Sequence, residues 1–504
     1  MKCKKRAVLI FILFVAGAFP LFSQDIFTEI EKGNLDEVKR LIQNDPQLVY
    51  SRVRGIFPLH QAVRSRRIDI AKFLISEGAD INKFGKDADE FAPYEATAVT
   101  EAIRYGDMNM IRLFVDSGAD LSKVTSLGES YLHYAAFMNR KEIVKYLIDS
   151  GLDVNIKKRG DLTPLHIATL MGFDDIVSLL IDNKADLNAQ STDGATPLHY
   201  ARAASHERTA ELIKSRGAKE IPRNFTKYSG PYLGIKSPGS KPEVFAPELF
   251  RAIYRAHSTP AFSPDGKELY WECIFMRGNN DASRIWYMRE ENGVWTPPRI
   301  APFSEYPSGG SAFYQDGEKL LYFSLRSRDG SSKPAKDPDL WYVERKEGEW
   351  SSPIHLDSPL NKDGTAEVYP LVAEDGSIYL NRGSQGYVKS AYVNGEYKEV
   401  ETIGDLFYTE YVDNCKAMKY ILMFSDRGRS ERYEYEIYIS YHKQDGRWSK
   451  PVYLGDQLHP GRRATQAVVT FDGKFLFFAS YFYYYWVDAK IIEEIRPEDL
   501  SYIP

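Results

Sequence analysis

The stretch His257-Ser-Thr-Pro-Ala-Phe-Ser-Pro-Asp-Gly-Lys-Glu-Leu-Tyr-Trp271 decides the fold of the C-terminal half of the chain. It predicts two short strands joined by a tight turn, because Pro264 fixes φ at the first turn position and Gly266 can adopt the positive φ that closes the turn. Beyond the turn, the residues pass from polar to aromatic, as in a strand that enters a packed sheet. Variants of this turn recur at Ala312–Gly317, Leu371–Gly376 and Val469–Gly473.

A second landmark, a glycine followed two residues later by an aromatic residue, repeats with the turns. It occurs as Gly293-Val-Trp295, Gly348-Glu-Trp350, Gly395-Glu-Tyr397 and Gly446-Arg-Trp448. The aromatic positions are therefore 55, 47 and 51 residues apart. Between each turn and its aromatic residue lies another apolar strand, and in the fourth copy the turn is the altered Val412–Lys416. Each period of about 50 residues thus holds four short strands, which is the unit of a propeller blade.

On these residues the region resembles the WD40-like PD40 repeats of TolB-type β-propellers. Ser263-Pro-Asp-Gly266 carries the motif, and Trp486–Ile492 is similar to the closing segment of secreted bacterial proteins of this type. The resemblance covers about Tyr228 to Pro497. It implies an all-β propeller that serves as a binding module, and it implies little about activity.

The number of blades follows from counting strands. Five turns but only four Gly-x-aromatic strands leave the last blade one strand short. Because Pro231–Gly234 is similar to Pro451–Gly455, we expect residues 231–234 to supply the missing outer strand and to leave no open sheet edge. The count is five blades, and six blades, with an extra one from Ile235 to His257, is the alternative.

The first half of the chain contains shorter repeats. Thr163-Pro-Leu-His-Ile-Ala168 returns as Thr196–Ala201 and, in altered form, as Ser130–Ala135, so that His133, His166 and His199 are 33 residues apart. Earlier copies are Phe57–Ala62 and the weaker Thr97–Ala102. A second anchor keeps nearly the same step at Gly78–Asn82, Gly118–Ser122, Gly151–Asn155 and Lys184–Asn188.

These repeats resemble ankyrin repeats over about Asp25 to Glu220, which implies an α-solenoid of about six repeats. The chemistry agrees, because Thr or Ser can cap a helix and Pro is tolerated in its first turn. Each repeat can bury its apolar stripe only against its neighbours. The repeated histidines could suggest a metal site, but stacked helices lie about 8–10 Å apart and cannot share one ion. We expect the histidines to form hydrogen bonds in the repeat turns instead.

The N-terminus has the three parts of a secretory signal. Met1–Arg6 is basic, Ala7–Ala18 is apolar, and Phe19–Gln24 ends in small and polar residues, so we expect cleavage after Ser23. A membrane anchor is the alternative, although the apolar run is short for a span of about 20 residues. The signal predicts a periplasmic or secreted protein, typical of a Gram-negative bacterium, with no stable membrane span after cleavage.

Length and composition place these parts in a multidomain α + β protein. The chain has 504 residues, and 43% hydrophobic with 27% charged residues is a globular composition. The expected boundaries are a signal peptide at 1–23, an ankyrin-repeat domain at 25–220, a linker at 221–230, a propeller at 231–497 and a tail at 498–504. Removing the four basic residues of the signal changes the formal charge from −5 to −9, which argues against binding nucleic acid. Cys273 and Cys415 remain, and we expect free thiols, with a disulfide as the alternative.

Candidate ligand-binding residues come from the ends of the predicted strands. Arg326, Arg382 and Arg427 each follow the second strand of a blade and would form a cationic rim for an anionic or glycan ligand if those ends converge. The alternative is an ion pair within a blade, such as Arg326 with Asp339 or Arg427 with Glu436. Glu367 and Glu410 precede inner strands and could line the channel, and the alternative is that they are solvated. The turn residues Asp265, Asp316, Asp375 and Asp472 are interpreted as turn-forming.

No catalytic, cofactor-binding or metal-binding motif is present in the sequence. The leading hypothesis is therefore an exported, non-enzymatic binding or scaffold protein that engages protein partners through the ankyrin concave face and the propeller mouth. The runner-up is an enzyme or binder that acts on glycans or peptides in the propeller channel, with Glu367 and Glu410 as its first candidate carboxylates. A structural spacer of the cell envelope is a third possibility.

Overall fold

The structure is a computed structural model that describes residues 19–53, 55–86, 95–125, 128–223, 225, 227–252, 258–274, 283–331, 333–402, 412–415, 420–425, 436–441, 449–450, 452–454, 458, 465–480 and 483–496. The chain divides into two compact units. The first comprises residues 1–158, 163–168 and 173–186, and the second comprises residues 159–162, 169–172 and 187–504. Among the described residues, no helix is long and apolar enough to cross a membrane.

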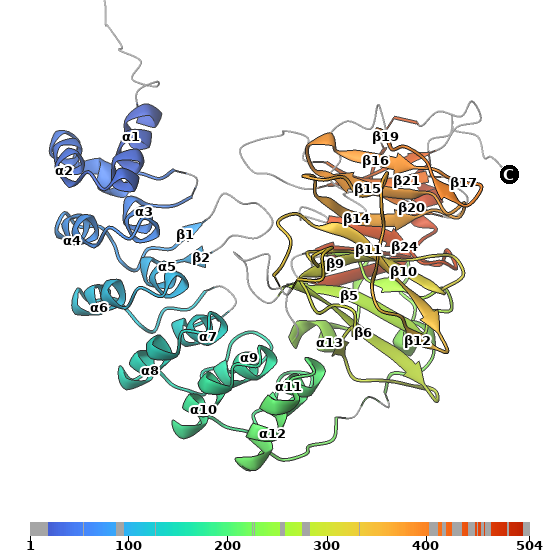
Figure 1. The fold of residues 1–504 in the computed structure, drawn as a ribbon, viewed down its shortest axis with the longest axis horizontal. Coiled ribbons are helices and arrows are strands. Elements are labelled where there is room, and N and C mark those ends of the chain that lie inside the picture. Colours follow the sequence, from blue (N-terminus) through green and yellow to red (C-terminus); the bar gives the residue numbers. More distant parts are fainter. Residues whose placement is uncertain are drawn as a thin grey trace, which may run out of the picture. The chain divides into compact units, whose positions relative to one another are not determined.

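Short helices in pairs make up the first unit and continue into the second (Figure 1). The pairs of the first unit are α1 (Phe19–Lys32) with α2 (Leu35–Asn44), α3 (Pro58–Arg64) with α4 (Ile68–Ser76), α5 (Ala98–Tyr105) with α6 (Met108–Asp116), α7 (Tyr131–Phe137) with α8 (Lys141–Asp149), and α9 (Pro164–Leu170) with α10 (Asp174–Asp182). A short helix, η1 (Pro46–Tyr50), and a hairpin of β1 (Gly85–Lys86) and β2 (Glu95–Ala96) connect the early pairs. The pair α11 (Pro197–Ala203) and α12 (Glu207–Ser215) lies in the second unit.

The histidines His133, His166 and His199 complete the caps of the first helix in three of the pairs, at α7, α9 and α11. The hydroxyl of Thr163 lies 2.9 Å from Nδ1 of His166, and the backbone N–H of Thr163 donates to the same ring nitrogen at 3.1 Å. Ser130 with His133 and Thr196 with His199 repeat this arrangement at 2.9 and 2.8 Å. The prediction that the histidines bind the turns is therefore confirmed.

Polar contacts between successive repeats fix their spacing. Arg140, which precedes α8, donates to the carbonyls of Ile103 and Arg104 at the end of α5, at 3.3 and 2.6 Å. A Cβ at Gly106 would lie 3.1 Å from the Arg140 guanidinium, so glycine leaves room for this contact at a position with φ of +68°. In the turns, Oδ1 of Asn82 accepts from the backbone N–H of Asp120 at 2.8 Å. Neighbouring repeats thus satisfy each other's free backbone groups.

Antiparallel sheets dominate the second unit. Within the described residues, five sheets have four or more strands. The first sheet contains β4 (Ala261–Phe262), β5 (Glu268–Ile274), β6 (Ser283–Glu291), β7 (Val294–Trp295) and β8 (Arg299–Ile300). The second contains β9 (Ser308–Phe313), β10 (Lys319–Ser324), β11 (Asp339–Lys346), β12 (Glu349–Trp350) and β13 (Ile354–His355). The third contains β14 (Glu367–Val372), β15 (Ile378–Arg382), β16 (Tyr387–Ser390) and β19 (Glu401–Thr402).

Two further sheets and a hairpin complete this part. The hairpin is β17 (Tyr392–Val393) with β18 (Glu396–Tyr397). The fourth sheet contains β20 (Val412–Cys415), β21 (Tyr420–Ser425), β22 (Glu436–Tyr441) and β23 (Val452–Tyr453). The fifth contains β24 (Thr465–Val469), β25 (Phe475–Ser480), β26 (Tyr483–Asp488) and β3 (Glu243–Val244), which comes from far earlier in the chain. Short helices α13 (Pro247–Ala252) and α15 (Ile491–Glu494) flank these strands in the sequence.

The sheets have a propeller-like arrangement. Residues of the first strands of four sheets, β4, β9, β14 and β24, line one common narrow cavity of about 80 Å³. Apolar side chains fill the spaces between neighbouring sheets, with Tyr270 and Phe313 in one cluster and Leu321 and Leu380 in the next. This packing of sheet against sheet is how a propeller buries its core. Cys273 is a buried free thiol, as predicted.

The closing strand differs from the prediction. Residues Pro231–Gly234 form a 3-10 turn, η2, with Tyr232 at φ of +55°, and β3 instead pairs with β26. Tyr232 has another task, because its ring packs 4.9 Å from Phe262 of the first sheet and 5.2 Å from Phe475 of the fifth. The prediction that residues 231–234 supply the outer strand was wrong, although the segment joins the same two sheets.

The two repeated landmarks have distinct roles in the sheets. In four of the turns an aspartate accepts a backbone N–H, as Asp265 does from Lys267 at 3.1 Å and Asp375 from Ser377 at 2.9 Å, which confirms the turn-forming interpretation. The altered copy differs, because Val412–Cys415 forms the strand β20. Two of the aromatic residues contact the preceding sheet, whereas Trp295 Nε1 donates to the carbonyl of Gly230 at 2.8 Å. Trp350 Nε1 donates to the hydroxyl of Tyr270 at 2.7 Å, and the hydroxyl of Tyr397 lies 2.8 Å from that of Tyr314.

Candidate functional site

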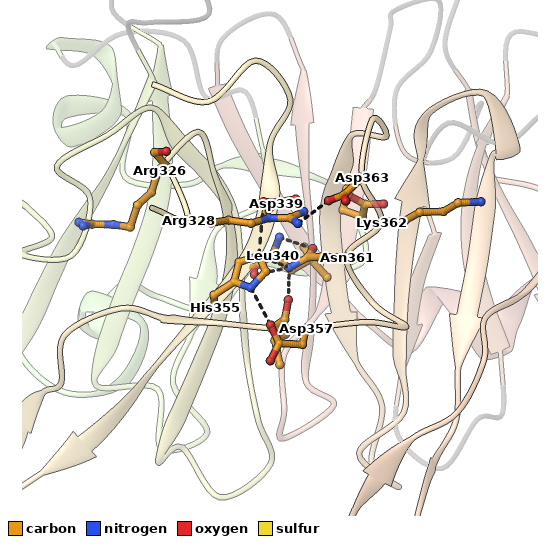
Figure 2. A network of polar contacts seen from close by, with 12 residues as sticks. Arg326, Arg328, Asp339, Leu340, His355, Asp357, Asn361, Lys362 and Asp363 are labelled. Carbon is orange, nitrogen blue, oxygen red and sulfur yellow. Dashed lines mark hydrogen bonds and ion pairs between the residues drawn. The ribbon is translucent and has the colours of Figure 1, made fainter. Parts of the chain in front are cut away.

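A polar network lies at one end of the second and third sheets (Figure 2). Asp339 begins β11 and is paired in register with Ser324 at the end of β10. Glu367 begins β14, and its backbone N–H donates to the carbonyl of Pro338 at 3.0 Å, which joins the third sheet to the second. The connections β10–β11 and β13–β14 meet here, because both leave the sheets at this end. We call residues 355–363, which run from the end of β13 into the second connection, the clasp loop.

An arginine holds the clasp loop to β11. Arg328 forms a bidentate pair with Asp339 at 2.6 and 2.8 Å, and its third donor reaches Asp363 at 2.6 Å. Asp339, and then Asp363, raise the pKa of the Arg328 guanidinium above its usual range. The fork of a guanidinium suits such bidentate pairing, so this contact fixes direction as well as distance.

The amide of Asn361 ties the clasp loop to the backbone of β11. Its Oδ1 accepts from the N–H of Leu340 at 2.7 Å, and its Nδ2 donates to the carbonyl of Leu340 at 2.9 Å and to that of Leu356. Nδ2 also lies 3.1 Å from Nε2 of His355. The same Nε2 lies 3.4 Å from Oδ2 of Asp339, and Nδ1 of His355 lies 3.2 Å from Oδ1 of Asp357.

A buried ion pair supports the same loop from the third sheet. Nε of Arg382 lies 3.0 Å from Oε1 of Glu367, and the two side chains are 3% and 0% exposed. Nη2 of Arg382 donates to the carbonyl of Pro359 at 2.7 Å and to that of Leu360. Burial raises the pKa of Glu367, while the Thr365 hydroxyl and Arg382 act in the opposite direction. The clasp loop is therefore held by side chains from two sheets.

The network leaves three charged side chains available to other molecules. Asp357 and Asp363 are each 93% exposed, and Lys362 is also exposed and extends away from the network in Figure 2. On the side of the third sheet, Lys362 and Arg382 line a cavity of about 440 Å³. No group of histidine, cysteine or carboxylate side chains within the described ranges could hold a metal ion. The arrangement presents exposed charges on a loop that side chains from two sheets hold in place.

The structure brings together two of the five residues proposed from the sequence. Arg382 and Glu367 form the buried pair just described. Arg326 lies apart, with its guanidinium 4.8 Å from the Tyr306 ring centroid and 3.2 Å from Glu305. The carboxylate of Asp339, suggested as its partner within the blade, is paired with Arg328 instead. Arg427 and Glu410 lie outside the described residues.

Sequence reasoning missed most of the network. Arg328, His355, Asn361 and Asp363 were not proposed, because the contacts that join the clasp loop and Arg328 to each other and to β11 span 11 to 35 residues and no periodic landmark marks them. The available signal was the run Asn361-Lys-Asp-Gly364 in a connection between two strands. Such polar, glycine-containing runs favour turns with side-chain-to-backbone hydrogen bonds.

A family model for ankyrin repeats matches three consecutive segments, residues 26–85, 84–158 and 157–224. The N-terminal region consists of ankyrin repeats. Its capped helix pairs and the hydrogen bonds between successive turns are how this ankyrin region builds a continuous stack. Ankyrin repeats imply a protein-binding scaffold.

Curated relatives match the ankyrin region over about a quarter of the chain. A putative palmitoyltransferase ZDHHC13 of Danio rerio is 30% identical over 124 residues, which are 25% of this chain and 18% of the relative. Palmitoyltransferase AKR1 of Lachancea kluyveri is 29% identical over 119 residues, 23% of this chain and 15% of the relative. A putative ankyrin repeat protein, L371 of Acanthamoeba polyphaga mimivirus, is 30% identical over 115 residues, which are 23% of this chain and 14% of the relative. The chain thus spans less than a fifth of the length of each of these relatives.

Proposed function

We propose that this is an exported, non-enzymatic scaffold protein that binds protein partners through the turns and inner helices of its ankyrin region. The observation that carries the proposal is the stack of capped repeats, which presents its turns in a fixed array. Preorganised surfaces lose little conformational freedom on binding, which favours affinity. Export rests on the signal-like residues 1–24, and the compartment would be the periplasm or the medium.

Exposed apolar and charged side chains on the turns support this role. Val124 is 41% exposed and Tyr50 is 53% exposed, and Lys83 is exposed in the turn after α4. Apolar side chains at the surface beside charged ones are typical of protein interfaces. The turns therefore combine an apolar contact with a charge that can select a partner.

For the second half we propose a PD40, TolB-like propeller of five blades over residues 231–497, with residues 221–230 as the linker and 498–504 as a tail. Support comes from the five sheets, from the cavity shared by the first strands of four of them, and from Tyr232, which packs against both the first and the fifth sheet. The end that carries the clasp loop would be a second binding face, for a protein or for an anionic or glycan ligand.

The alternative, an enzyme or binder for glycans or peptides in the channel, has weaker support. Glu367 is fully buried against Arg382, so it does not offer a free carboxylate to a substrate. The cavity shared by the first strands is lined mainly by apolar side chains such as Phe313 and Val469. Such a lining favours an apolar group of a bound partner over hydrolysis.

Affinity capture with the full-length protein tests the proposal. A partner captured from an extract of the native host should bind saturably, and Lys83→Glu combined with Val124→Asp should weaken binding at least tenfold. Lys145→Glu is the matched control, because Lys145 lies on α8 and pairs with exposed Asp149 at 2.9 Å. Saturable binding that the double variant leaves unchanged would contradict a role for the turns. No saturable partner at all would favour a structural spacer.

A further inference from the structure

The cavity beside the clasp loop has the size and lining of a small-molecule site. Its volume is about 440 Å³, within the range of about 300–1,000 Å³ that ligand pockets occupy. Valine and proline side chains form part of its lining. The charged and polar residues that line it are Lys362, Arg382, Glu399, Ser358, Gln385 and Thr402. It lies against β16 and β19, away from the cavity that the first strands share.

The wall of this cavity is held unusually firmly. Three anchors fix the clasp loop: the Arg382 contacts with Pro359 and Leu360, the Asn361 contacts with β11, and the Arg328 contact with Asp363. Lys362 lies between two of these anchored positions, so the backbone that carries its amine has little freedom. Loops fixed in this way bind with a smaller loss of entropy than mobile ones.

The charges of the lining define the ligand. Two cations, Lys362 and Arg382, and one exposed carboxylate, Glu399, line the cavity. Arg382 is balanced in part by Glu367, which leaves Lys362 as the cation that is free to meet an anion. Glu399, Gln385 and Thr402, which also line the cavity, can accept hydrogen bonds from hydroxyl groups.

We propose that this cavity binds a small carboxylate that also carries hydroxyl groups, the chemistry of a sugar acid. The carboxylate would contact Lys362, and the hydroxyl groups would donate to Glu399. A hydrogen bond between an ammonium and a carboxylate typically contributes more binding free energy than one between neutral groups, so Lys362 should dominate the affinity. Glu399 should discriminate between a hydroxylated acid and a simple anion.

Calorimetric titration of the full-length protein with D-glucuronate tests the proposal, with D-glucose and inorganic phosphate as comparison ligands. Glucuronate should bind saturably, at least tenfold more tightly than glucose. Lys362→Ala should weaken glucuronate binding at least tenfold, and Lys398→Ala, which removes an exposed lysine paired with Glu396, should leave it unchanged. Glu399→Gln should weaken the binding of glucuronate but not that of phosphate.

Each other outcome overturns the proposal. Glucose that binds as tightly as glucuronate would mean that charge is not recognised. Binding that survives Lys362→Ala would place the ligand elsewhere, and phosphate as the only binder would exclude a hydroxylated acid. If the heats measured for all three ligands equal their heats of dilution, no ligand binds and the proposed site is excluded. None of these results depends on the protein-binding proposal, because the ankyrin turns are unchanged in every variant.

Discussion

Glu367 and Arg382 form a buried ion pair at the start of the third sheet, with Oε1 and Nε 3.0 Å apart and neither side chain more than 3% exposed. Arg382 also donates to two carbonyls of the clasp loop. A buried ion pair typically makes a protein no more stable than two apolar residues in the same positions would. Losing one partner, however, leaves an uncompensated buried charge and destabilises the fold. The pair therefore couples the shape of the clasp loop to the stability of the sheet.

Replacing Arg382 by methionine should destabilise the sheets by about 3–5 kcal/mol, because Glu367 would remain buried without a cation. The double variant Glu367→Leu with Arg382→Met should recover most of that loss. Tryptophan fluorescence during urea unfolding measures the change, since all seven tryptophans lie after residue 270 and report on the sheets alone. A loss below 1 kcal/mol in the single variant would show that the pair is not buried in solution.

Replacing Asn361 by alanine should cost about 1–3 kcal/mol, because it leaves the buried N–H and carbonyl of Leu340 without their side-chain partner. Hydrogen exchange of the clasp loop should rise in the same variant. Asp357→Ala is the control: the side chain is 93% exposed, so its contact with His355 should contribute less than about 1 kcal/mol. Equal effects of the two substitutions would count against the anchoring role of Asn361.

Replacing Ser130 by alanine should destabilise the ankyrin region by about 1 kcal/mol, because Ser130 caps α7 and contacts His133. Circular dichroism at 222 nm reports on the helices and separates this effect from the sheets. Ser117→Ala, at an exposed helix end, should change stability by less than about 0.5 kcal/mol. A larger effect at Ser117 than at Ser130 would be inconsistent with the capping box.

The last repeat should lose stability on mild acidification. Burial, and then the positive charge of Arg223, lower the pKa of His199 from 6.5 to about 4. The unfolded chain therefore binds a proton that the folded repeat excludes, so stability is full above pH 6.5 and falls as the pH drops from 6.5 toward 4. The unfolding temperature of the helices should decrease across this window, and His199→Gln should flatten the decrease. A profile that is identical in the two proteins would refute the assignment to His199.

Periodic features of the fold could be predicted from the sequence because each one repeats with its physical cause. Asp265 and Gly266 mark a turn, and Thr163 with His166 marks a helix start. The outer strand of the fifth sheet could not be predicted, because Pro231–Gly234 is similar to another strand but Tyr232 adopts a positive φ and packs between two sheets. Tertiary packing there overrides the local pattern.

The candidate site was harder to predict than the fold. Arg326 and Arg328 are two residues apart, and only the path of the β10–β11 connection decides that Arg328 meets Asp339. The pairing of Glu367 with Arg382 depends on the register of β14 and β15, which the sequence does not state. The sequence could locate candidate residues at the ends of predicted strands, but it could not identify the partners of their side chains.

Site-specific photocrosslinking tests most directly whether the ankyrin turns bind a protein. A photoreactive phenylalanine analogue at Val124 of the full-length protein should form one discrete adduct in an extract of the native host, and excess unlabelled protein should abolish it. The same analogue at Lys145 on α8 should give no such adduct. If Val124 yields no competable adduct, or if Lys145 yields the same one, the proposed binding surface is contradicted.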